Sequence, residues 1–216
     1  MEHEATELVH IVKGVAAPVV IREQRSRGLS FQVWPAASAL CSFLEEKQTE
    51  WMVPGASVLE LGSGPGLVGL VAARLGAARV LLTDLPQAIP NLAYNAQRNF
   101  PGDGGAVIEA RTLRWGVEED VAQLAQDWSF DLIVASDVVY YDYLFQPLLQ
   151  TLKWLLSSSP PQDRPPKVLL AHIRRWTKDT KFFKMARKSF QVEVVATYPP
   201  PPGNKKPVVI YSLAAR

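Results

Sequence analysis

A glycine-rich turn is the part of this 216-residue chain whose residue types and spacing most clearly could do chemistry. The stretch VLELGSGPGLVG, residues 58–69, joins a strand-like start to glycines and then to an apolar helical pattern. Where a strand ends in glycines and a helix follows, main-chain N–H groups and the helix dipole favour an anion, and the missing side chains let a ligand approach the backbone. The turn therefore predicts a site for an anionic group of a cofactor.

This turn fits two cofactor motifs. From Gly64 onward, GPGLVG matches the G-x-G-x-x-G turn that binds the pyrophosphate of dinucleotides. From Glu60 onward, an acidic residue precedes G-x-G-x-G, the turn that in methyltransferases binds the methionine carboxylate of S-adenosylmethionine. Asp84 ends the next predicted strand, where a carboxylate can accept the ribose hydroxyls of either cofactor. These residues alone leave both cofactors open.

The two acidic residues each have a structural alternative. Glu60 lies in an otherwise apolar strand, where an unpaired carboxylate is costly to bury. We expect it to orient the turn or to meet a ligand's ammonium group, directly or through water. Asp84 could instead cap the helix that follows it. A phosphate-binding P-loop is excluded, because no Gly-Lys-Ser/Thr follows the glycines.

The elements that must position these residues alternate along the chain. After Gly55, short aliphatic runs alternate with amphipathic stretches, which is typical of a parallel sheet with crossover helices. Because the strands are apolar almost throughout, helices must cover both faces of this α/β sheet. The predicted strands are 57–61, 79–84, 106–112, 130–137 and 167–173. The predicted helices are 67–75, 87–99, 117–126, 143–156 and about 177–189.

The two ends of the chain add to this core. Strands 190–197 and 207–214 are joined by a connection too short for a crossover helix, so they should be antiparallel and complete a seven-stranded sheet. Residues 8–24 predict a β-hairpin, and Pro35 is well placed to begin a helix. We expect a single domain over residues 1–216, with a hairpin and helix extension (1–54) and a seven-strand cofactor-binding core (55–216).

Composition limits the class of protein and its partners. With 48% hydrophobic and 20% charged residues, the chain can bury one core, and a net charge of +2 gives no argument for nucleic acid or an anionic membrane. The single cysteine, Cys41, excludes an internal disulfide, fits a reducing compartment and should be buried. The first residues lack a signal-peptide pattern, and the apolar runs are shorter than the roughly 20 residues of a membrane-spanning helix. We expect a soluble, monomeric cytoplasmic protein, with the nucleus left open.

Five motifs in one order resemble the small seven-β-strand protein-lysine methyltransferases over roughly residues 31–214. These motifs are VWPAA (33–37), LELGSGPGLVG (59–69), LTDLP (82–86), LRWG (113–116) and SDVVYY (136–141), the last containing the family's D-x-x-Y hallmark. The resemblance implies a Rossmann-like, mostly parallel methyltransferase fold with a C-terminal antiparallel strand pair. It also implies S-adenosylmethionine as cofactor and a protein substrate, such as a chaperone, a translation factor or another ATPase. Gly69 is then a helix-packing glycine outside the cofactor motif.

The resemblance also implies the cofactor contacts. Gly62, Gly64 and Gly66 would surround the methionine end of S-adenosylmethionine, Asp84 would bind the ribose, and Trp115 would lie beside the adenine. The remaining cofactor-binding positions would be Trp34, Glu60, Ala135 and Ser136. For the two tryptophans, packing in the core is the alternative.

Asp137 and Tyr140 carry the implied chemistry. Ligands of an open parallel sheet bind beyond the carboxyl ends of its strands, so Asp137 would face the transferable methyl group. It would hold the lysine amine or help its proton leave, and Tyr140 would add an oxygen acceptor and an aromatic wall. Their alternatives are a cap on the following helix for Asp137 and ordinary packing for Tyr140, and Tyr141 is expected to pack.

Other features favour or weaken competing functions. The chain lacks the N-P-P-Y or D-P-P-Y motif of enzymes that methylate amide or base nitrogens, and its three histidines have no metal-ligand spacing. A methyltransferase for small molecules or nucleic acid, and a non-catalytic binding module, remain alternatives. The basic segment 174–188 is either a solvated face or a docking surface for an acidic partner protein, with an RNA contact a weaker third.

Overall fold

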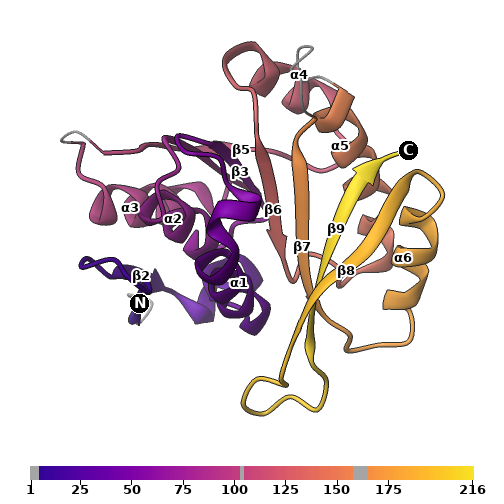
Figure 1. Cartoon of the computed structure of the whole chain (residues 1–216), viewed down its shortest axis with the longest axis horizontal. Helices are drawn as coiled ribbons and strands as arrows, with labels where there is room; N and C mark the ends of the chain where they lie inside the picture. Colours follow the sequence, from indigo (N-terminus) through magenta and orange to yellow (C-terminus); the bar gives the residue numbers. More distant parts are fainter. Residues whose placement is uncertain (1–4, 103–104, 158–164) are drawn as a thin grey trace.

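The computed structural model describes residues 5–102, 105–157 and 165–216. Figure 1 shows a large mixed sheet with helices on both faces and the N-terminal hairpin beside it. The strands are β1 (Thr6–His10), β2 (Val19–Glu23), β3 (Ser57–Leu61), β4 (Arg79–Asp84), β5 (Val107–Thr112), β6 (Leu132–Ser136), β7 (Lys167–Ile173), β8 (Phe190–Tyr198) and β9 (Val208–Ala215). The helices are α1 (Pro35–Trp51), α2 (Leu67–Arg74), α3 (Ile89–Asn99), α4 (Glu118–Asp127), α5 (Phe145–Ser157) and α6 (Asp179–Ala186).

The large sheet has the order β5-β4-β3-β6-β7-β9-β8. Strands β3 to β7 are parallel, whereas β9 is antiparallel to both β7 and β8. The predicted seven-stranded α/β fold with a C-terminal antiparallel pair is confirmed. The chain changes direction across the sheet between β3 and β6, and ligands of such sheets bind beyond the carboxyl ends of the strands at that point.

Alternating side chains of the central strands build two cores. In β3, Val58 lies in the core under α1, α2 and α3, whereas Leu59 and Leu61 lie in the core under α4, α5 and α6. This alternation follows from the two-residue repeat of a strand that is covered on both faces. Glu60 shares the face of Val58 and is only 1% exposed, so its carboxylate is directed toward α2.

The predicted N-terminal hairpin is confirmed, and it forms a sheet of its own. Its second strand is fixed to α3 by polar contacts that the sequence pattern did not reveal. The main-chain N–H groups of Val20 and Arg22 donate to the side-chain oxygens of Asn99 and Asn95, at 2.8 and 2.9 Å. The buried face of α3 is therefore partly polar, because it supplies the hydrogen bonds that one edge of β2 lacks.

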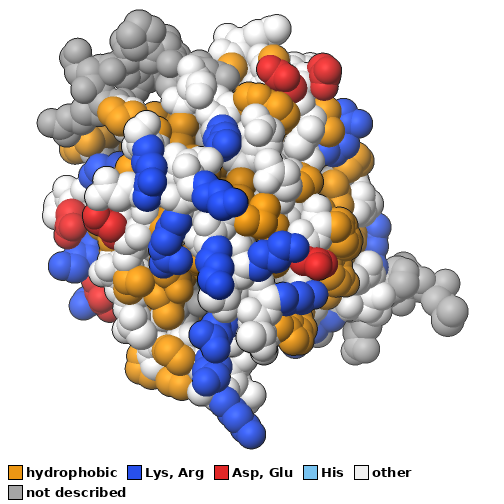
Figure 2. Space-filling model, turned by 90° about the vertical axis from the view of Figure 1, so that its right-hand side faces the viewer, with side chains coloured by type: hydrophobic (Ala, Val, Ile, Leu, Met, Phe, Trp, Pro, Cys, Tyr) orange, Lys and Arg blue, Asp and Glu red, His pale blue; other side chains and the backbone are white. Residues whose placement is uncertain are grey.

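The C-terminal region differs slightly from the prediction. Helix α6 spans only Asp179–Ala186, shorter than the predicted 177–189. Ile173 pairs with Val208, so the loop between β8 and β9 leaves the sheet at the carboxyl end of β7. Lysines and arginines gather on the outer surface of this part of the molecule (Figure 2). Among the described helices, none combines the length and the apolar character needed to cross a membrane.

Candidate active site

The glycine turn between β3 and α2 has the left-handed backbone that its sequence predicts. Gly62, Gly64 and Gly66 have φ angles of 60°, 53° and 93°, a region in which other residues are strained. A β-carbon at Gly66 would lie 2.7 Å from the side chain of Leu92. Glycine is therefore required here both for the backbone conformation and for close packing under the start of α2.

Glu60 orients this turn from below. Its Oε2 accepts a hydrogen bond of 2.9 Å from the main-chain N–H of Gly69, in the first turn of α2. A β-carbon at Gly69 would lie 3.0 Å from the same oxygen, so this glycine lets the helix approach the carboxyl group. Burial raises the pKa of Glu60 to about 8, and the N–H groups of the helix oppose that rise.

The raised pKa of Glu60 predicts a pH-dependent stability of the cofactor-free protein. In the unfolded chain the group ionises near its ordinary pKa, so the folded state holds more protons between that pKa and about 8. The stabilisation is present in full at low pH and is lost as pH rises through about 8. Between about pH 6 and pH 8, the free energy of unfolding should fall in the native protein and in Glu60→Gln by different amounts. We expect the fall to be larger in the native protein, by on the order of 2 kcal/mol.

Parallel pH dependences of the native protein and Glu60→Gln in chemical denaturation would contradict this prediction. Glutamine is a suitable comparison because it has the shape of the protonated acid and can still accept the hydrogen bond from Gly69.

Asp84, at the carboxyl end of β4, is 7% exposed and holds the turn from the side. Its Oδ2 accepts from the N–H of Gly64 at 2.8 Å, and its Oδ1 accepts from the N–H of Leu85 at 2.7 Å and from Oγ of Ser30 at 3.1 Å. Burial raises the pKa of this carboxyl group, and the three hydrogen bonds oppose the rise. Each carboxylate oxygen can accept more than one hydrogen bond, so the group can also bind a ligand's hydroxyls.

Trp115 packs against the glycine turn. A β-carbon at Gly62 would lie 2.9 Å from the ring of Trp115 and 3.0 Å from Val138. The indole is half-buried at the edge of the core under α4, α5 and α6, and it also lines the cavity described next. Core packing and a role in the cavity are therefore combined in this residue.

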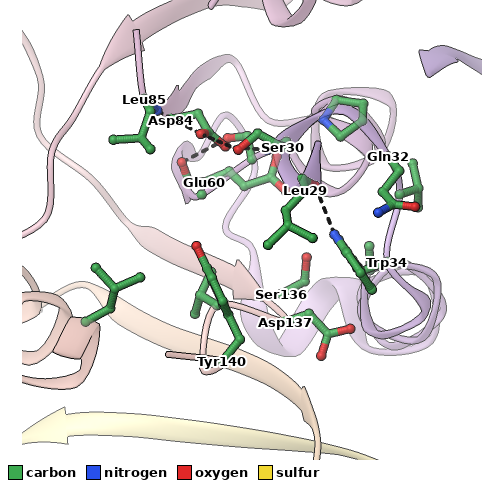
Figure 3. Close-up of a pocket in the computed structure, with 18 of the residues that line it drawn as sticks. Leu29, Ser30, Gln32, Trp34, Glu60, Asp84, Leu85, Ser136, Asp137 and Tyr140 are labelled. Carbon is green, nitrogen blue, oxygen red and sulfur yellow. Dashed lines mark hydrogen bonds between the residues drawn. The ribbon is translucent and has the colours of Figure 1, made fainter. Parts of the chain in front are cut away.

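A cavity of about 340 Å³ opens at the carboxyl ends of β3, β4 and β6 (Figure 3). Its volume lies in the range typical of small-molecule sites. Two of the predicted contact residues do not line it. Gly66 packs against Leu92 at the start of α2, and Ala135 packs in the core with 2% exposure. The predicted residues that do line it are Trp34, Glu60, Gly62, Gly64, Asp84, Trp115, Ser136, Asp137 and Tyr140.

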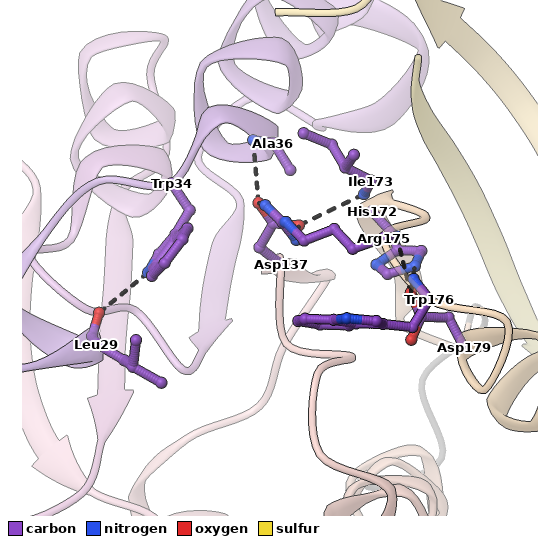
Figure 4. A network of polar contacts seen from close by, with 9 residues as sticks. All are labelled: Leu29, Trp34, Ala36, Asp137, His172, Ile173, Arg175, Trp176 and Asp179. Carbon is purple, nitrogen blue, oxygen red and sulfur yellow. Dashed lines mark hydrogen bonds and ion pairs between the residues drawn. The ribbon is translucent and has the colours of Figure 1, made fainter. Parts of the chain in front are cut away.

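Asp137 follows β6 with a φ of 55°, a left-handed conformation for a residue other than glycine. Its carboxylate forms two hydrogen bonds with the guanidinium group of Arg175, at 2.8 and 2.9 Å (Figure 4). The main-chain N–H groups of Ala36 and Ile173 lie 3.4 Å from the same two oxygens. Asp137 therefore contacts the start of α1, not the helix that follows it in the chain, and its charge is balanced by an arginine.

The loop that carries Arg175 is itself fixed by buried polar groups. Oδ2 of Asp179 accepts hydrogen bonds from the N–H groups of Arg175 and Trp176, at 3.0 and 3.1 Å. His172 lies 3.4 Å from this carboxylate, and burial lowers the pKa of the imidazole. The guanidinium of Arg175 also lies 5.5 Å from the ring of Trp34.

No group of residues that could bind a metal ion occurs in the described parts of the chain.

Tyrosines from the D-x-x-Y loop form one wall of the cavity. The Tyr140 side chain points into the space beneath Asp84 and Leu85 (Figure 3), and burial raises its pKa to about 12, so the hydroxyl stays neutral. Tyr141, expected to pack, is instead 43% exposed and lies between Tyr140 and Tyr143, with ring centroids 4.8 and 5.3 Å away. Tyr140 and Tyr141 therefore line the cavity, whereas Tyr143 is exposed to solvent outside it.

A protein-family model described as lysine methyltransferase matches residues 16–189. The chain belongs to the lysine methyltransferase family. Two relatives are protein N-lysine methyltransferase METTL21A of Danio rerio, 38% identical over 78% of this chain and 72% of its own length, and protein-lysine methyltransferase METTL21E of Mus musculus, 35% identical over 77% and 66%. The chain thus spans about two thirds of the mouse relative.

Solved structures support the fold of this lysine methyltransferase family member. The O-methyltransferase from Bacillus cereus, solved in complex with SAH, superposes with a TM-score of 0.59 at 16% sequence identity. The match covers 88% of this chain and 86% of that one. At this identity the likeness concerns the fold alone.

Several residues of the site in this lysine methyltransferase family member were not predicted, among them two with polar contacts to the predicted acids and one exposed tryptophan. Ser30 binds Asp84 from the segment before α1, Arg175 pairs with Asp137, and Trp176 lines the cavity. Arg175 had a usable signal, because it follows β7 and the carboxyl ends of neighbouring parallel strands meet at one edge. For Ser30 we find no signal in the sequence.

Proposed function

We propose that this protein transfers methyl groups from S-adenosylmethionine to a lysine side chain of a protein substrate. The observation that carries the proposal is that the glycine turn, Asp84, Asp137 and Tyr140 line the same cavity. The chain's membership of the lysine methyltransferase family selects lysine among the groups that such a cavity could receive.

The residues present fit S-adenosylmethionine. The left-handed glycine turn exposes main-chain atoms to a carboxylate, Asp84 can accept hydrogen bonds from ribose hydroxyls, and Trp115 offers an aromatic face for adenine. The Asp84 carboxylate favours a ligand that carries positive charge, and such a ligand would favour the ionised form of Glu60, whose pKa burial raises to about 8. When bound, S-adenosylmethionine supplies an electrophilic methyl group.

The protein must make the lysine amine neutral and align it. An ammonium group has no free electron pair, and removal from water in the cavity lowers its pKa. Tyr140 offers a neutral hydroxyl oxygen as acceptor and an aromatic ring for the cation. Asp137 supplies a carboxylate whose two hydrogen bonds to Arg175 would be partly exchanged for one from the amine. Most of the rate enhancement then comes from positioning.

The substrate class follows from the relatives. Those compared above are named as methyltransferases of protein lysines, which supports a protein substrate here. A chaperone, a translation factor or another ATPase is the kind of substrate we propose. We also propose a cytoplasmic, monomeric protein; the buried, unpaired Cys41 agrees with a reducing compartment.

Incubation of the protein with radiolabelled S-adenosylmethionine and a cell extract tests the proposed function. We expect a labelled protein band whose label maps to lysine by mass spectrometry, and much less label with the Asp137→Asn variant. Label found only in small molecules or RNA would refute a protein-lysine substrate. Binding of the cofactor without any transfer would instead support a non-catalytic role.

A further inference from the structure

A strongly basic surface begins at the mouth of the cavity. Between residues 174 and 188, seven side chains are cationic, and Asp179 is the one acid in this segment. Asp179 is completely buried, so it does not offset charge at the surface. Figure 2 shows lysines and arginines gathered over this face, with few acidic side chains among them. The exposed cations, here called the α6 basic face, are Arg174, Lys178, Lys181, Lys184, Arg187 and Lys188.

These six cations have no acidic partner in the described parts of the chain. Among the described residues, no ion pair involves any of them, whereas Arg98, Arg111 and Arg114 elsewhere on the surface are each paired with an acid. The whole chain has a net charge of only +2, so the positive charge of the α6 basic face is a local concentration. Such a surface attracts an oppositely charged partner and directs its approach.

The α6 basic face is continuous with the candidate active site. Trp176 is 50% exposed and lines the cavity, and Lys178 Nζ lies 5.3 Å from its ring. Helix α6 starts directly after these residues, and its eight residues extend about 12 Å away from the cavity. Lys205 and Lys206, in the loop that leaves the sheet at the same end, are also exposed. A partner bound on this face would therefore reach the cavity.

We propose that the α6 basic face docks an acidic segment of the substrate protein next to the lysine that enters the cavity. This inference rests on the proposed function and names the chemistry of its substrate. An extended segment rises about 3.3 Å per residue, so acids within about three to six residues of the target lysine would lie along α6. A nucleic acid is less favoured, because Phe182 and Phe183 of α6 are buried, so that Trp176 is the exposed ring of segment 174–188 and no row of rings is available for successive bases.

Peptide binding tests the docking proposal. Three fluorescein-labelled probes are compared by anisotropy: a peptide with one lysine followed by glutamates at three to six residues, the same peptide with glutamines, and a single-stranded oligonucleotide of equal charge. We expect the acidic peptide to bind most tightly and its affinity to fall as salt is raised. Equal affinity for the glutamine peptide, or tighter binding of the oligonucleotide, would overturn the proposal.

Charge reversal on α6 locates the binding surface. We expect Lys181→Glu combined with Lys184→Glu to weaken acidic-peptide binding by about tenfold or more. Lys13→Glu reverses one charge, against two in the α6 variant, in the hairpin connection between β1 and β2 on the other side of the molecule (Figure 1), and should alter the affinity less than about twofold. The α6 variant should bind S-adenosylmethionine normally, because neither lysine lines the cavity. An equal loss of affinity per reversed charge at the two places would contradict docking on α6.

The same reagents separate this proposal from the proposed function. If the acidic peptide binds to the α6 basic face but no labelled lysine forms in any protein, the enzymatic proposal fails while the docking surface stands. If lysine is methylated with equal efficiency in acidic and glutamine peptides, the enzymatic proposal stands and the docking surface fails.

Discussion

Asp137→Asn is expected to lower the turnover number for methyl transfer by about 10²-fold while cofactor affinity changes little. The substitution removes the negative charge that would hold the lysine amine, and it leaves the Arg175 guanidinium without its ionic partner. Asparagine is the informative replacement, because it tolerates the φ of 55° better than alanine and keeps one oxygen acceptor. Steady-state label incorporation and titration calorimetry with S-adenosylmethionine measure the two effects.

Arg175→Gln is the matched control for the role of Asp137. If Asp137 acts on the amine, this variant should retain activity within about tenfold, because the carboxylate remains. If Asp137 serves only to hold Arg175 and the start of α1, both single variants and the double variant should lose activity and thermal stability alike. Normal turnover by Asp137→Asn would remove Asp137 from the mechanism.

Asp84→Ala is expected to weaken S-adenosylmethionine binding by about 100-fold. Hydrogen bonds to a charged acceptor contribute about 1.5–3 kcal/mol each, and the carboxylate would accept one from each ribose hydroxyl. The variant also loses the acceptor for the Gly64 N–H, so the glycine turn is held less firmly. Because burial already makes the charged carboxylate costly, we expect the fold itself to tolerate the change.

Ser30→Ala separates the two contributions of Asp84. It removes one hydrogen bond to the carboxylate and leaves the ribose acceptor in place, so we expect less than about a tenfold loss of affinity. Calorimetry of both variants, with thermal unfolding as a check on folding, makes the comparison. Native-like affinity of Asp84→Ala would show that another group binds the ribose.

Much of the fold could be predicted because burial leaves a local pattern in the chain. Strands β3, β4 and β7 begin and end at the predicted residues, since both of their faces are covered and their apolar runs are continuous. The end of α6 was less predictable, because exposed lysines continue past the helix and local composition does not change there. Helix ends are set by capping and packing as much as by periodicity.

The sequence by itself determined the sheet, the glycine turn and the positions of Glu60, Asp84 and Asp137, because these depend on spacing along single strand–turn–helix units. Only the tertiary structure decided which groups these acids meet. Asp84 binds Ser30 from 54 residues away, and Asp137 binds Arg175 from 38 residues away. Such contacts depend on how separate loops assemble at one edge of the sheet, and no local periodicity records that arrangement.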